Sequence, residues 1–402
     1  MMLQGAELQA RLGRLGAFLE AHESLWRPRP FAVLRCPWED PYPELAGWLR
    51  ERTLDESIAL DRMETSDFPE PLGAWARRAS ELSDLPAWEA VAPVAPVRVR
   101  QQPARKRAQI RAFSAMVRPD ASPIVEWCAG KAYLGRSLAL RDGAPAVAVE
   151  VRPELCRAAE TLAAEDGIGL DTVCADVCTD DGARALRPGA RVVALHACGH
   201  LTDALFDAAG NVDIDAVYAA PCCCHRIVGE IFEPRSSVGS RHDLRLTSAD
   251  LRLATAEEVS LSPARMVRRR REMAWRLGLD LLLRQSGASG YTAVPRMGRA
   301  VVRLPFEAFV ARMSAEHGLT LPARWDPVAA EEAGWERARV VRGLTLVRSV
   351  FRRPLELFCW LDRALALQEA GWKVQIGLFC ERQVTPRNVL VVARRDEGDG
   401  PC

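Results

Sequence analysis

Lysine is nearly absent from this sequence, and so are the patterns that mark a membrane protein or a secreted protein. Only three of the 54 basic residues are lysine, so arginine carries the positive charge. No run of about 18 apolar residues occurs, which excludes a membrane-spanning helix. The N-terminal stretch also lacks the basic segment followed by an apolar segment that a signal peptide needs. We therefore expect a cytoplasmic protein.

Cysteine is abundant, with twelve residues, but the arrangement is not that of a secreted disulfide framework. Three cysteines are consecutive, Cys222, Cys223 and Cys224, and most others lie within apparent strands or beside glycines. Because no export signal is seen, reduced thiols are expected. No repeated C-x-x-C pair occurs, and we assign no metal site from the sequence.

Length and charge suggest several structural units and an anionic partner. A chain of 402 residues predicts two or three units. Residues 1–100 hold 12 basic and 16 acidic side chains, a net charge of −4. Residues 231–353 hold 22 arginines and 13 acidic side chains, a net charge of +9. This contrast favours nucleic acid as a partner, and a well-solvated arginine-rich helical face explains it equally well.

The pattern of apolar residues changes along the chain. In the first region, residues 1–100, apolar residues recur at helical spacing. A proline-rich linker at residues 91–103 overlaps the end of this region. Short apolar runs then alternate with helical stretches from residue 104 to residue 230, which indicates a parallel, doubly wound α/β sheet. Residues 231–350 interrupt this alternation with a basic insertion. Residues 351–397 add a helix and two strands joined by a short turn, which predicts seven strands with the last antiparallel.

The turn after the first expected strand has the features of a cofactor loop. The sequence there is Glu126-Trp-Cys128-Ala-Gly130, followed by a helix. Gly130 allows the backbone to approach a ligand closely, and the helix N-terminus receives its polar groups. We therefore expect Glu126, Cys128 and Gly130 to border a cofactor.

Two acidic residues at later strand ends extend this cofactor site. Glu150 ends the second strand, where a carboxylate can bind two ribose hydroxyls. Asp176 follows the third strand beside Val177, where it can accept a hydrogen bond from an adenine amino group. This set suits S-adenosylmethionine. A nicotinamide dinucleotide is the competing interpretation, but its G-x-G-x-x-G pattern is missing.

Cysteine and histidine residues follow the fourth and fifth strands, in His196-Ala-Cys198-Gly-His and Pro-Cys222-Cys223-Cys-His225. Adjacent strands of a doubly wound sheet bring such residues into one pocket. Three interpretations stay open at this point. His225 is a general base; or His196, Cys198, Cys222 and His225 bind zinc; or the cysteines are small buried residues.

At these motifs the chain resembles a known group. E-W-C-A-G-K, L-H-A-C-G-H-L-T-D and P-C-C-C-H are similar to the motifs H-x-C-G…T-D and P-C-C-x-H of a methyltransferase-like family. That family includes eukaryotic tRNA ribose methyltransferases. The resemblance covers about residues 104–230 and 354–395, and the basic residues 105–107 and the stretch Thr385–Asn388 also fit it. Residues 1–100 match no motif of the family.

The resemblance implies a Rossmann-like class I methyltransferase fold, S-adenosylmethionine as cofactor, and RNA (tRNA or rRNA) as substrate. By motif position, the cofactor is held by Glu126, Gly130, Glu150 and Asp176 and flanked by His196 and Cys198. The same positions put Cys222, Cys223 and His225 on the acceptor side. Ala132 departs from the family because a glycine is more usual there, and Cys224 departs because an aromatic residue or histidine is frequent.

Two other functions stay open. One is a protein or small-molecule methyltransferase on the same fold, and the other is a non-catalytic binding module that keeps the fold. Four aromatic residues of the basic insertion could stack on RNA bases or belong to a core, namely Trp275, Tyr291, Trp325 and Trp335.

Overall fold

Two compact units make up the chain in this computed structural model, which describes residues 2–61, 68–91, 103–256, 263–295 and 304–395. Unit 1 contains Met1–Ala21, Leu82–Val259 and Arg353–Cys402, and unit 2 contains His22–Glu81 and Ser260–Arg352. The expected segments 1–100 and 231–350 are each divided between the two units. The expected linker at residues 91–103 lies almost entirely outside the described residues.

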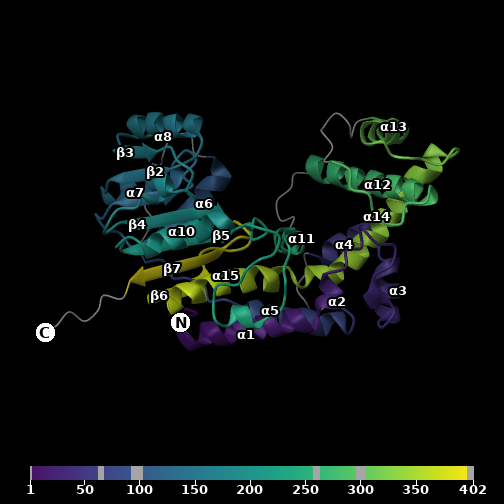
Figure 1. The fold of residues 1–402 in the computed structure, drawn as a ribbon, viewed down its shortest axis with the longest axis horizontal. Helices are drawn as coiled ribbons and strands as arrows, with labels where there is room; N and C mark the ends of the chain where they lie inside the picture. Colours follow the sequence, from purple (N-terminus) through teal and green to yellow (C-terminus); the bar gives the residue numbers. More distant parts are fainter. Residues whose placement is uncertain (1, 62–67, 92–102, 257–262, 296–303, 396–402) are drawn as a thin grey trace. The chain divides into compact units, whose positions relative to one another are not determined.

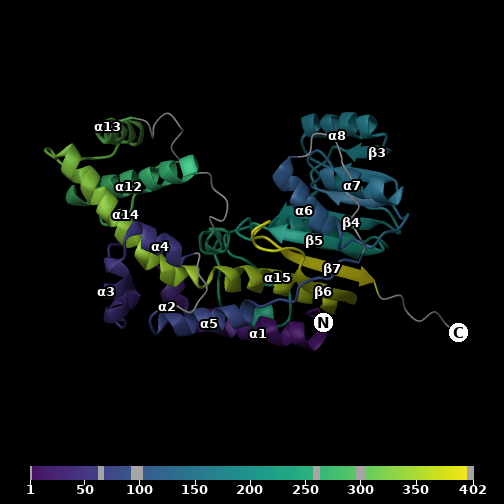
Figure 2. The ribbon, with the colours of Figure 1, turned by 180° about the vertical axis from the view of Figure 1, so that it is seen from behind.

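Unit 1 is built on one seven-stranded sheet (Figures 1 and 2). Its strands are β1 (Ile124–Trp127), β2 (Ala146–Val149), β3 (Leu170–Val173), β4 (Arg191–Cys198), β5 (Ala216–Cys222), β6 (Trp372–Leu378) and β7 (Val389–Arg395). Their order is β3-β2-β1-β4-β5-β7-β6. Strands β1 to β5 pair in parallel, and β7 runs antiparallel to both β5 and β6. The expected class I methyltransferase sheet is confirmed, with a loop at residues 379–388 where a short turn was expected.

Helices cover both faces of this sheet, which is why its strands are nearly continuous apolar runs. Every residue of β5 is buried. Phe113 and Leu138, from the helices labelled α6 and α7, pack with Ile124 and Tyr218 on one face, and Figures 1 and 2 show α10 and α15 on the other. The helices of unit 1 are α1 (Gly5–Ala21), α6 (Ala104–Ser114), α7 (Tyr133–Asp142), α8 (Pro153–Asp166), α9 (Asp180–Ala183), α10 (His200–Gly210), η3 (Gly239–Arg241), α11 (Ser248–Leu251), η4 (Leu253–Thr255) and α15 (Arg352–Glu369).

Unit 2 is helical throughout the part of it that the structure describes. Its helices are α2 (Glu23–Trp26), η1 (Pro37–Glu39), α3 (Pro43–Glu51), α4 (Leu54–Leu60), α5 (Leu72–Ser83), α12 (Pro263–Gln285), α13 (Phe306–His317) and α14 (Pro327–Ser349). Glycines let α12 and α14 pack closely. A Cβ on Gly278 would meet the carbonyl oxygen of Ala330, and a Cβ on Gly334 would overlap that of Ala274.

The aromatic residues of the basic insertion serve mainly as core. Trp275 is 3% exposed, stacks on Phe309 and donates a hydrogen bond to Glu331 (2.8 Å), so it cannot stack on a base. Trp325 and Tyr291 are half-buried against aromatic neighbours in the same unit. Trp335 is 37% exposed and alone keeps an open ring among these four residues.

None of the described helices combines the length and the apolar character needed to cross a bilayer. The eleven cysteines within the described residues are free thiols, and none of them takes part in a disulfide.

Substitution of the glycine at the α12–α14 contact should destabilise unit 2. We expect Gly334→Ala to lower the stability by about 1–3 kcal/mol, because the added methyl group overpacks two helix backbones. Gly47→Ala is the matched control, since Gly47 is an exposed helical position with no atom within 4 Å of a built Cβ. The control should raise the stability by up to about 1 kcal/mol. Thermal unfolding of both variants measures this, and equal midpoints would contradict it.

Candidate active site

The carboxyl ends of β1 to β5 meet at one edge of the sheet because these strands are parallel (Figure 1). Every predicted site residue lies at or just after one of these ends. The edge also contains unusual backbone. Five non-glycine residues among those described have positive φ, and four of them lie here, namely Cys128, Ala132, His196 and Cys223. Backbone strain of this kind concentrates at functional sites.

The loop after β1 is shaped to accept a ligand. Cys128, Gly130 and Ala132 have φ values of 57°, 62° and 51°, so the chain turns tightly before α7 begins. A Cβ built on Gly130 would meet no atom within 4 Å, which leaves open space beside the loop backbone. Ala132 adopts the left-handed backbone that the family's more usual glycine would adopt without strain.

Glu150 ties this loop to the end of β2. Its Oε2 accepts a hydrogen bond from the Gly130 backbone N–H at 2.9 Å. Its Oε1 accepts hydrogen bonds from the backbone N–H (3.2 Å) and the Nε (2.9 Å) of Arg152. The Glu150 side chain is 7% exposed and that of Arg152 is 60% exposed. The carboxylate is therefore fixed in place, and Arg152 is a neighbour that the sequence did not identify.

Asp176 lies after the next strand end. Its Oδ1 accepts a hydrogen bond from the Cys178 backbone N–H at 2.9 Å. The following residues, Val177 and Cys178, line a cavity of about 450 Å³ whose other walls include residues of α9, α10 and the segment 227–235, and whose lining does not include Asp176. This volume lies in the range of small-molecule sites, which span roughly 300–1,000 Å³.

Glu126 is hydrogen-bonded to the helix that follows the loop. Its Oε2 accepts a hydrogen bond from the backbone N–H of Gly135, in the first turn of α7, at 2.7 Å. A Cβ on Gly135 would lie 2.9 Å from this same oxygen, so the glycine makes room for the acid. Burial raises the pKa of Glu126 to about 7. This carboxyl group thus anchors the helix that follows the loop.

Cys128 lies near both the acidic residues and the other cysteines of this edge. Burial, and then the nearby negative groups of Glu150, Cys198, Cys178 and Asp176, raise the pKa of its thiol to about 12. Cys128 therefore stays protonated near neutral pH and lies among residues from the ends of several strands. The predicted cofactor acids and the thiols of β4 and β5 occupy one region of the edge.

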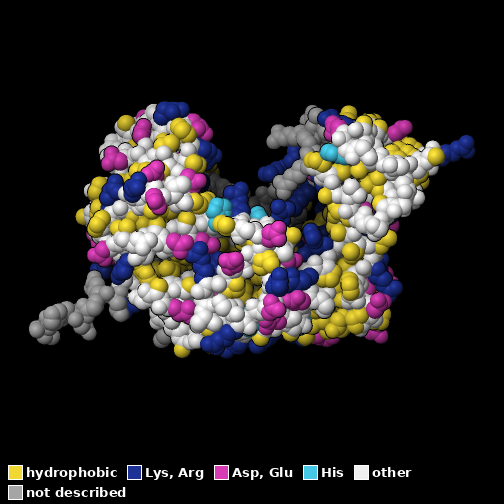
Figure 3. Space-filling model, in the orientation of Figure 1, with side chains coloured by type: hydrophobic (Ala, Val, Ile, Leu, Met, Phe, Trp, Pro, Cys, Tyr) yellow, Lys and Arg dark blue, Asp and Glu magenta, His cyan; other side chains and the backbone are white. Residues whose placement is uncertain are grey.

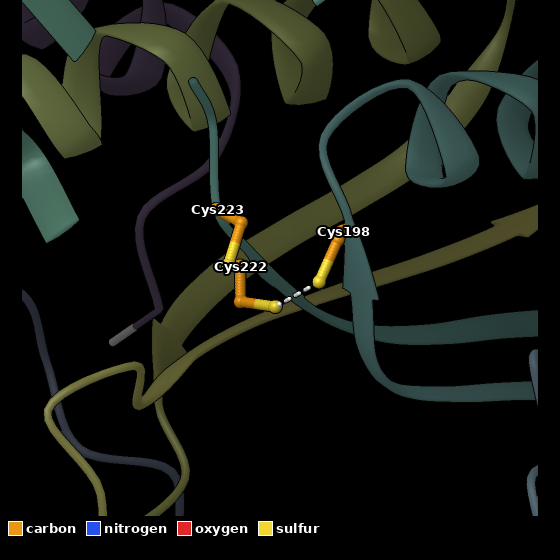
Figure 4. A group of neighbouring side chains, drawn as sticks. All are labelled: Cys198, Cys222 and Cys223. Atoms are coloured by element: carbon orange, nitrogen blue, oxygen red, sulfur yellow. Dashed lines mark hydrogen bonds between the residues drawn. The ribbon is translucent and has the colours of Figure 1, made fainter. Parts of the chain in front are cut away.

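Three thiols, Cys198, Cys222 and Cys223, form a group that we call the thiol cluster (Figure 4). Their sulfur atoms all lie within 4.8 Å of one another. The Cys198 and Cys222 sulfurs are 3.1 Å apart, and each thiol lies within hydrogen-bond reach of the His196 carbonyl oxygen, at 3.5 Å and 3.4 Å. A register shift in β4 between Leu195 and Cys198 brings Cys198 opposite Cys222 of β5.

The thiols of this cluster influence one another's protonation. Hydrogen bonds with Cys198 and Cys222 lower the pKa of Cys223, against the effect of burial. Hydrogen bonds with Cys198 and Cys223, together with burial, raise the pKa of Cys222. The hydrogen bonds among the three thiols thus shift the pKa values of Cys222 and Cys223 in opposite directions.

The other residues of the two motifs hold the strand ends together. Gly199 donates its N–H to the Cys222 carbonyl oxygen at 2.8 Å, and a Cβ there would overlap the Arg226 carbonyl oxygen. Thr202 Oγ1 donates to the Ala197 carbonyl oxygen at 2.9 Å. Asp203 forms an ion pair with Arg363 of α15 at 2.8 Å. Cys224 is buried, and its thiol lies 3.9 Å from the Leu251 carbonyl oxygen.

The two candidate histidines lie in different surroundings. The His196 ring contacts Gln109 of α6, with 3.3 Å between Nε2 and the amide oxygen. The His225 ring contacts Thr255, with 3.3 Å between Nδ1 and the hydroxyl oxygen. The sequence pointed to neither partner, because both lie far along the chain from the motifs.

Arginines surround His225. Burial lowers its pKa, and Arg252, Arg226 and Arg387 lower the pKa further, while Cys223 opposes them. Arg226 and Arg252 are exposed, and Arg387 donates to the Thr255 carbonyl oxygen at 2.6 Å. His225 is therefore neutral near pH 7 and lies in a region of positive charge.

Residues 105–230 match the family model described as a methyltransferase domain. The chain therefore contains a methyltransferase domain, and the matched segment carries β1 to β5 with all of their strand-end motifs. Domains of this class take their methyl group from S-adenosylmethionine. No protein with curated annotation matches the chain.

Solved structures with a related fold show only distant likeness. TrmK of M. capricolum, solved with S-adenosyl-homocysteine, is 12% identical over 28% of this chain and 50% of that chain, with a TM-score of 0.23. The 23S rRNA methyltransferase ErmE is 25% identical over 28% of this chain and 43% of that chain, with a TM-score of 0.21. The cyclopropane synthase MmaA2 of Mycobacterium tuberculosis is 10% identical over 76% of this chain and 88% of that chain, with a TM-score of 0.26. The chain thus spans half or less of the first two structures, and TM-scores this low say nothing about substrate.

The buried acid of β1 should make stability depend on pH. Between its ordinary pKa of 4.5 and its folded pKa of about 7, Glu126 is protonated in the folded protein and ionised in the unfolded chain. Its contribution to stability therefore falls as the pH rises through this range. Glu126→Gln stays neutral and keeps an oxygen for the Gly135 N–H, so its melting temperature relative to wild type should rise from pH 5 to pH 8.

Glu165→Gln is the control for this measurement, because Glu165 is an exposed acid of α8. Its melting temperature should follow that of the wild type at both pH values. A Glu126→Gln difference that does not change with pH would show that this carboxyl group titrates normally.

Proposed function

We propose that this protein is a cytoplasmic S-adenosylmethionine-dependent methyltransferase that acts on RNA, either tRNA or rRNA. The observation that carries the proposal is the methyltransferase-domain match over residues 105–230. In this segment Gly130, Glu150 and Asp176 follow the ends of β1, β2 and β3. The resemblance of its two Cys/His motifs to a family with tRNA ribose methyltransferases supports RNA as the substrate.

The residues at the strand ends fit this cofactor. The open space beside Gly130 leaves room for a ligand against bare backbone, and the fixed carboxylate of Glu150 can accept from ribose hydroxyls. Val177 and Cys178, which follow Asp176 in the chain, line a cavity of about 450 Å³. The bound cofactor supplies an electrophilic methyl group, so the protein's main task is to position the acceptor.

His225 is the proposed general base for a hydroxyl acceptor. Its lowered pKa keeps the imidazole neutral near pH 7, as a proton acceptor requires. Thr255 fixes the ring through Nδ1, which leaves Nε2 for the acceptor. Cys222 and Cys223 line the same side at the end of β5.

Positive charge around His225 favours a polyanionic substrate. Arg226 and Arg252 are exposed beside it and can contact phosphates. In unit 2, α12 exposes Arg265, Arg269 and Arg271 along its first half. Elsewhere basic and acidic side chains are mixed over the surface, as on the face in Figure 3. Local groups of arginines, not the net charge, therefore support RNA.

The proposal is tested by incubating the full chain with tritiated S-adenosylmethionine and separate RNA, protein and metabolite fractions. Label should enter the RNA fraction and be released by ribonuclease. Label in protein or metabolites would assign the protein or small-molecule alternative instead. Binding of the cofactor without transfer to any fraction would identify a non-catalytic module.

Loss of the β2 carboxylate should abolish cofactor binding. We expect Glu150→Ala to weaken the affinity for S-adenosylmethionine at least about 100-fold in calorimetry, since a charge-assisted hydrogen bond contributes roughly 1.5–3 kcal/mol and the Gly130 loop loses its tie. Glu154→Ala, an exposed acid four residues later, should bind like the wild type. Unchanged affinity of a folded Glu150→Ala protein would refute the ribose assignment.

Loss of the proposed base should separate binding from transfer. His225→Ala should keep the calorimetric affinity for the cofactor and lower the rate of RNA methylation by about 10²–10⁴-fold. His317→Ala removes an imidazole in the last turn of α13 and should methylate at the wild-type rate. Full turnover by His225→Ala would remove the base from the mechanism.

A further inference from the structure

We propose that the thiol cluster of Cys198, Cys222 and Cys223 binds one zinc ion, with three thiolate ligands and a fourth coordination position open. The inference does not depend on the proposed substrate, because it concerns binding of the metal alone. It concerns thiols that methyl transfer from a sulfonium donor to a hydroxyl does not by itself require.

The spacing of the sulfurs suits this ion. Zinc holds thiolates at about 2.3 Å in a tetrahedron, which separates the sulfurs by roughly 3.8 Å. The cluster has 3.1 Å between the Cys198 and Cys222 sulfurs and at most 4.8 Å between any two of the three. Small side-chain rotations therefore bring all three sulfurs to zinc-binding distances. Figure 4 shows the three side chains converging from two strand ends.

Two residues at the cluster have strained backbone conformations. Cys223 has a φ of 51° and His196 has a φ of 68°, and neither residue is a glycine. Such a conformation is strained and persists only where the surroundings enforce it. Cys223 is itself a member of the cluster, and His196 lies in the register shift of β4 between Leu195 and Cys198, after which Cys198 pairs with Cys222. Both strained residues thus lie where the thiols come together.

Ligand chemistry selects zinc among the common divalent ions. Thiolates are soft ligands that favour zinc over magnesium, calcium or manganese. Three thiolates and one Zn²⁺ carry a net charge of −1, and Arg226 and Arg387 lie close enough to compensate it. Three protein ligands with an open fourth position are typical of catalytic zinc sites. If the proposed methyl transfer is correct, an acceptor atom can occupy that position.

The structure also revises which residues could serve as ligands. The set considered from the sequence was His196, Cys198, Cys222 and His225. The ligand atoms that lie within 4.8 Å of one another belong to Cys198, Cys222 and Cys223, so Cys223 takes the place of the two histidines. Among the described residues, these three cysteines are the group of His, Cys, Asp and Glu side chains close enough to hold a metal ion.

The test measures metal content in the full chain, purified under reducing conditions without chelators. Metal analysis by mass spectrometry should find about one zinc per chain, because each chain has one set of three thiolate ligands. X-ray absorption at the zinc edge should show three sulfur neighbours in the wild type. Replacement of zinc by cobalt should give the intense absorption of thiolate-to-cobalt charge transfer.

Serine variants of single cysteines test which residues bind the zinc. Cys198→Ser, Cys222→Ser and Cys223→Ser should each lose the zinc, while Cys178→Ser, an exposed thiol after β3, should keep it. Wild-type protein without zinc, zinc without sulfur neighbours, or a Cys198–Cys222 disulfide in the purified chain would each overturn the proposal. The X-ray absorption result needs no variant, so it decides the matter if the serine variants fail to fold.

Zinc binding and methyl transfer are read separately, so the two proposals can fail independently. A chain that holds zinc but transfers no label leaves the metal site intact and removes the proposed function. A chain that methylates RNA and holds no zinc does the opposite.

Discussion

Gly199 allows the loop after β5 to pass directly over the end of β4, because any side chain there would overlap the Arg226 carbonyl oxygen. Its N–H donates to the Cys222 carbonyl oxygen, so the two strand ends are joined through backbone. The β4–β5 part of the candidate site lies around this contact. The thiols of both strands lie together there, the His225 ring contacts Thr255, and exposed arginines lie near that ring.

Motif residues at this edge divide into two groups with different tasks. Gly130, Glu150 and the thiol cluster lie around the loop and the strand ends, where a ligand can approach. Glu126, Thr202 and Asp203 are bonded into the scaffold, through α7, the β4 end and α15 respectively. A motif therefore marks the neighbourhood of a site, and only the direction of each side chain decides which residues can touch a ligand.

In unit 2, the number of arginines likewise does not show which of them can bind a ligand. Its arginines look like a polyanion-binding surface when counted, but several are used inside the unit. Arg342 and Arg352 share Asp61, and Arg284 and Arg337 share Asp280. Such pairs hold helices from distant parts of the chain together. Exposure, and not the number of arginines, therefore decides which of them a ligand can reach.

The sequence by itself determined the sheet, because buried parallel strands require short apolar runs, and these predicted all seven strands and the antiparallel last one. It also predicted that the candidate motifs share one edge, since the carboxyl ends of parallel strands meet there. Tertiary structure alone decided the partners: Gln109, Arg152 and Thr255 come from elements whose approach no local pattern encodes. It also decided that Trp275 is core and that Cys223 joins the thiol cluster, because both depend on side-chain direction.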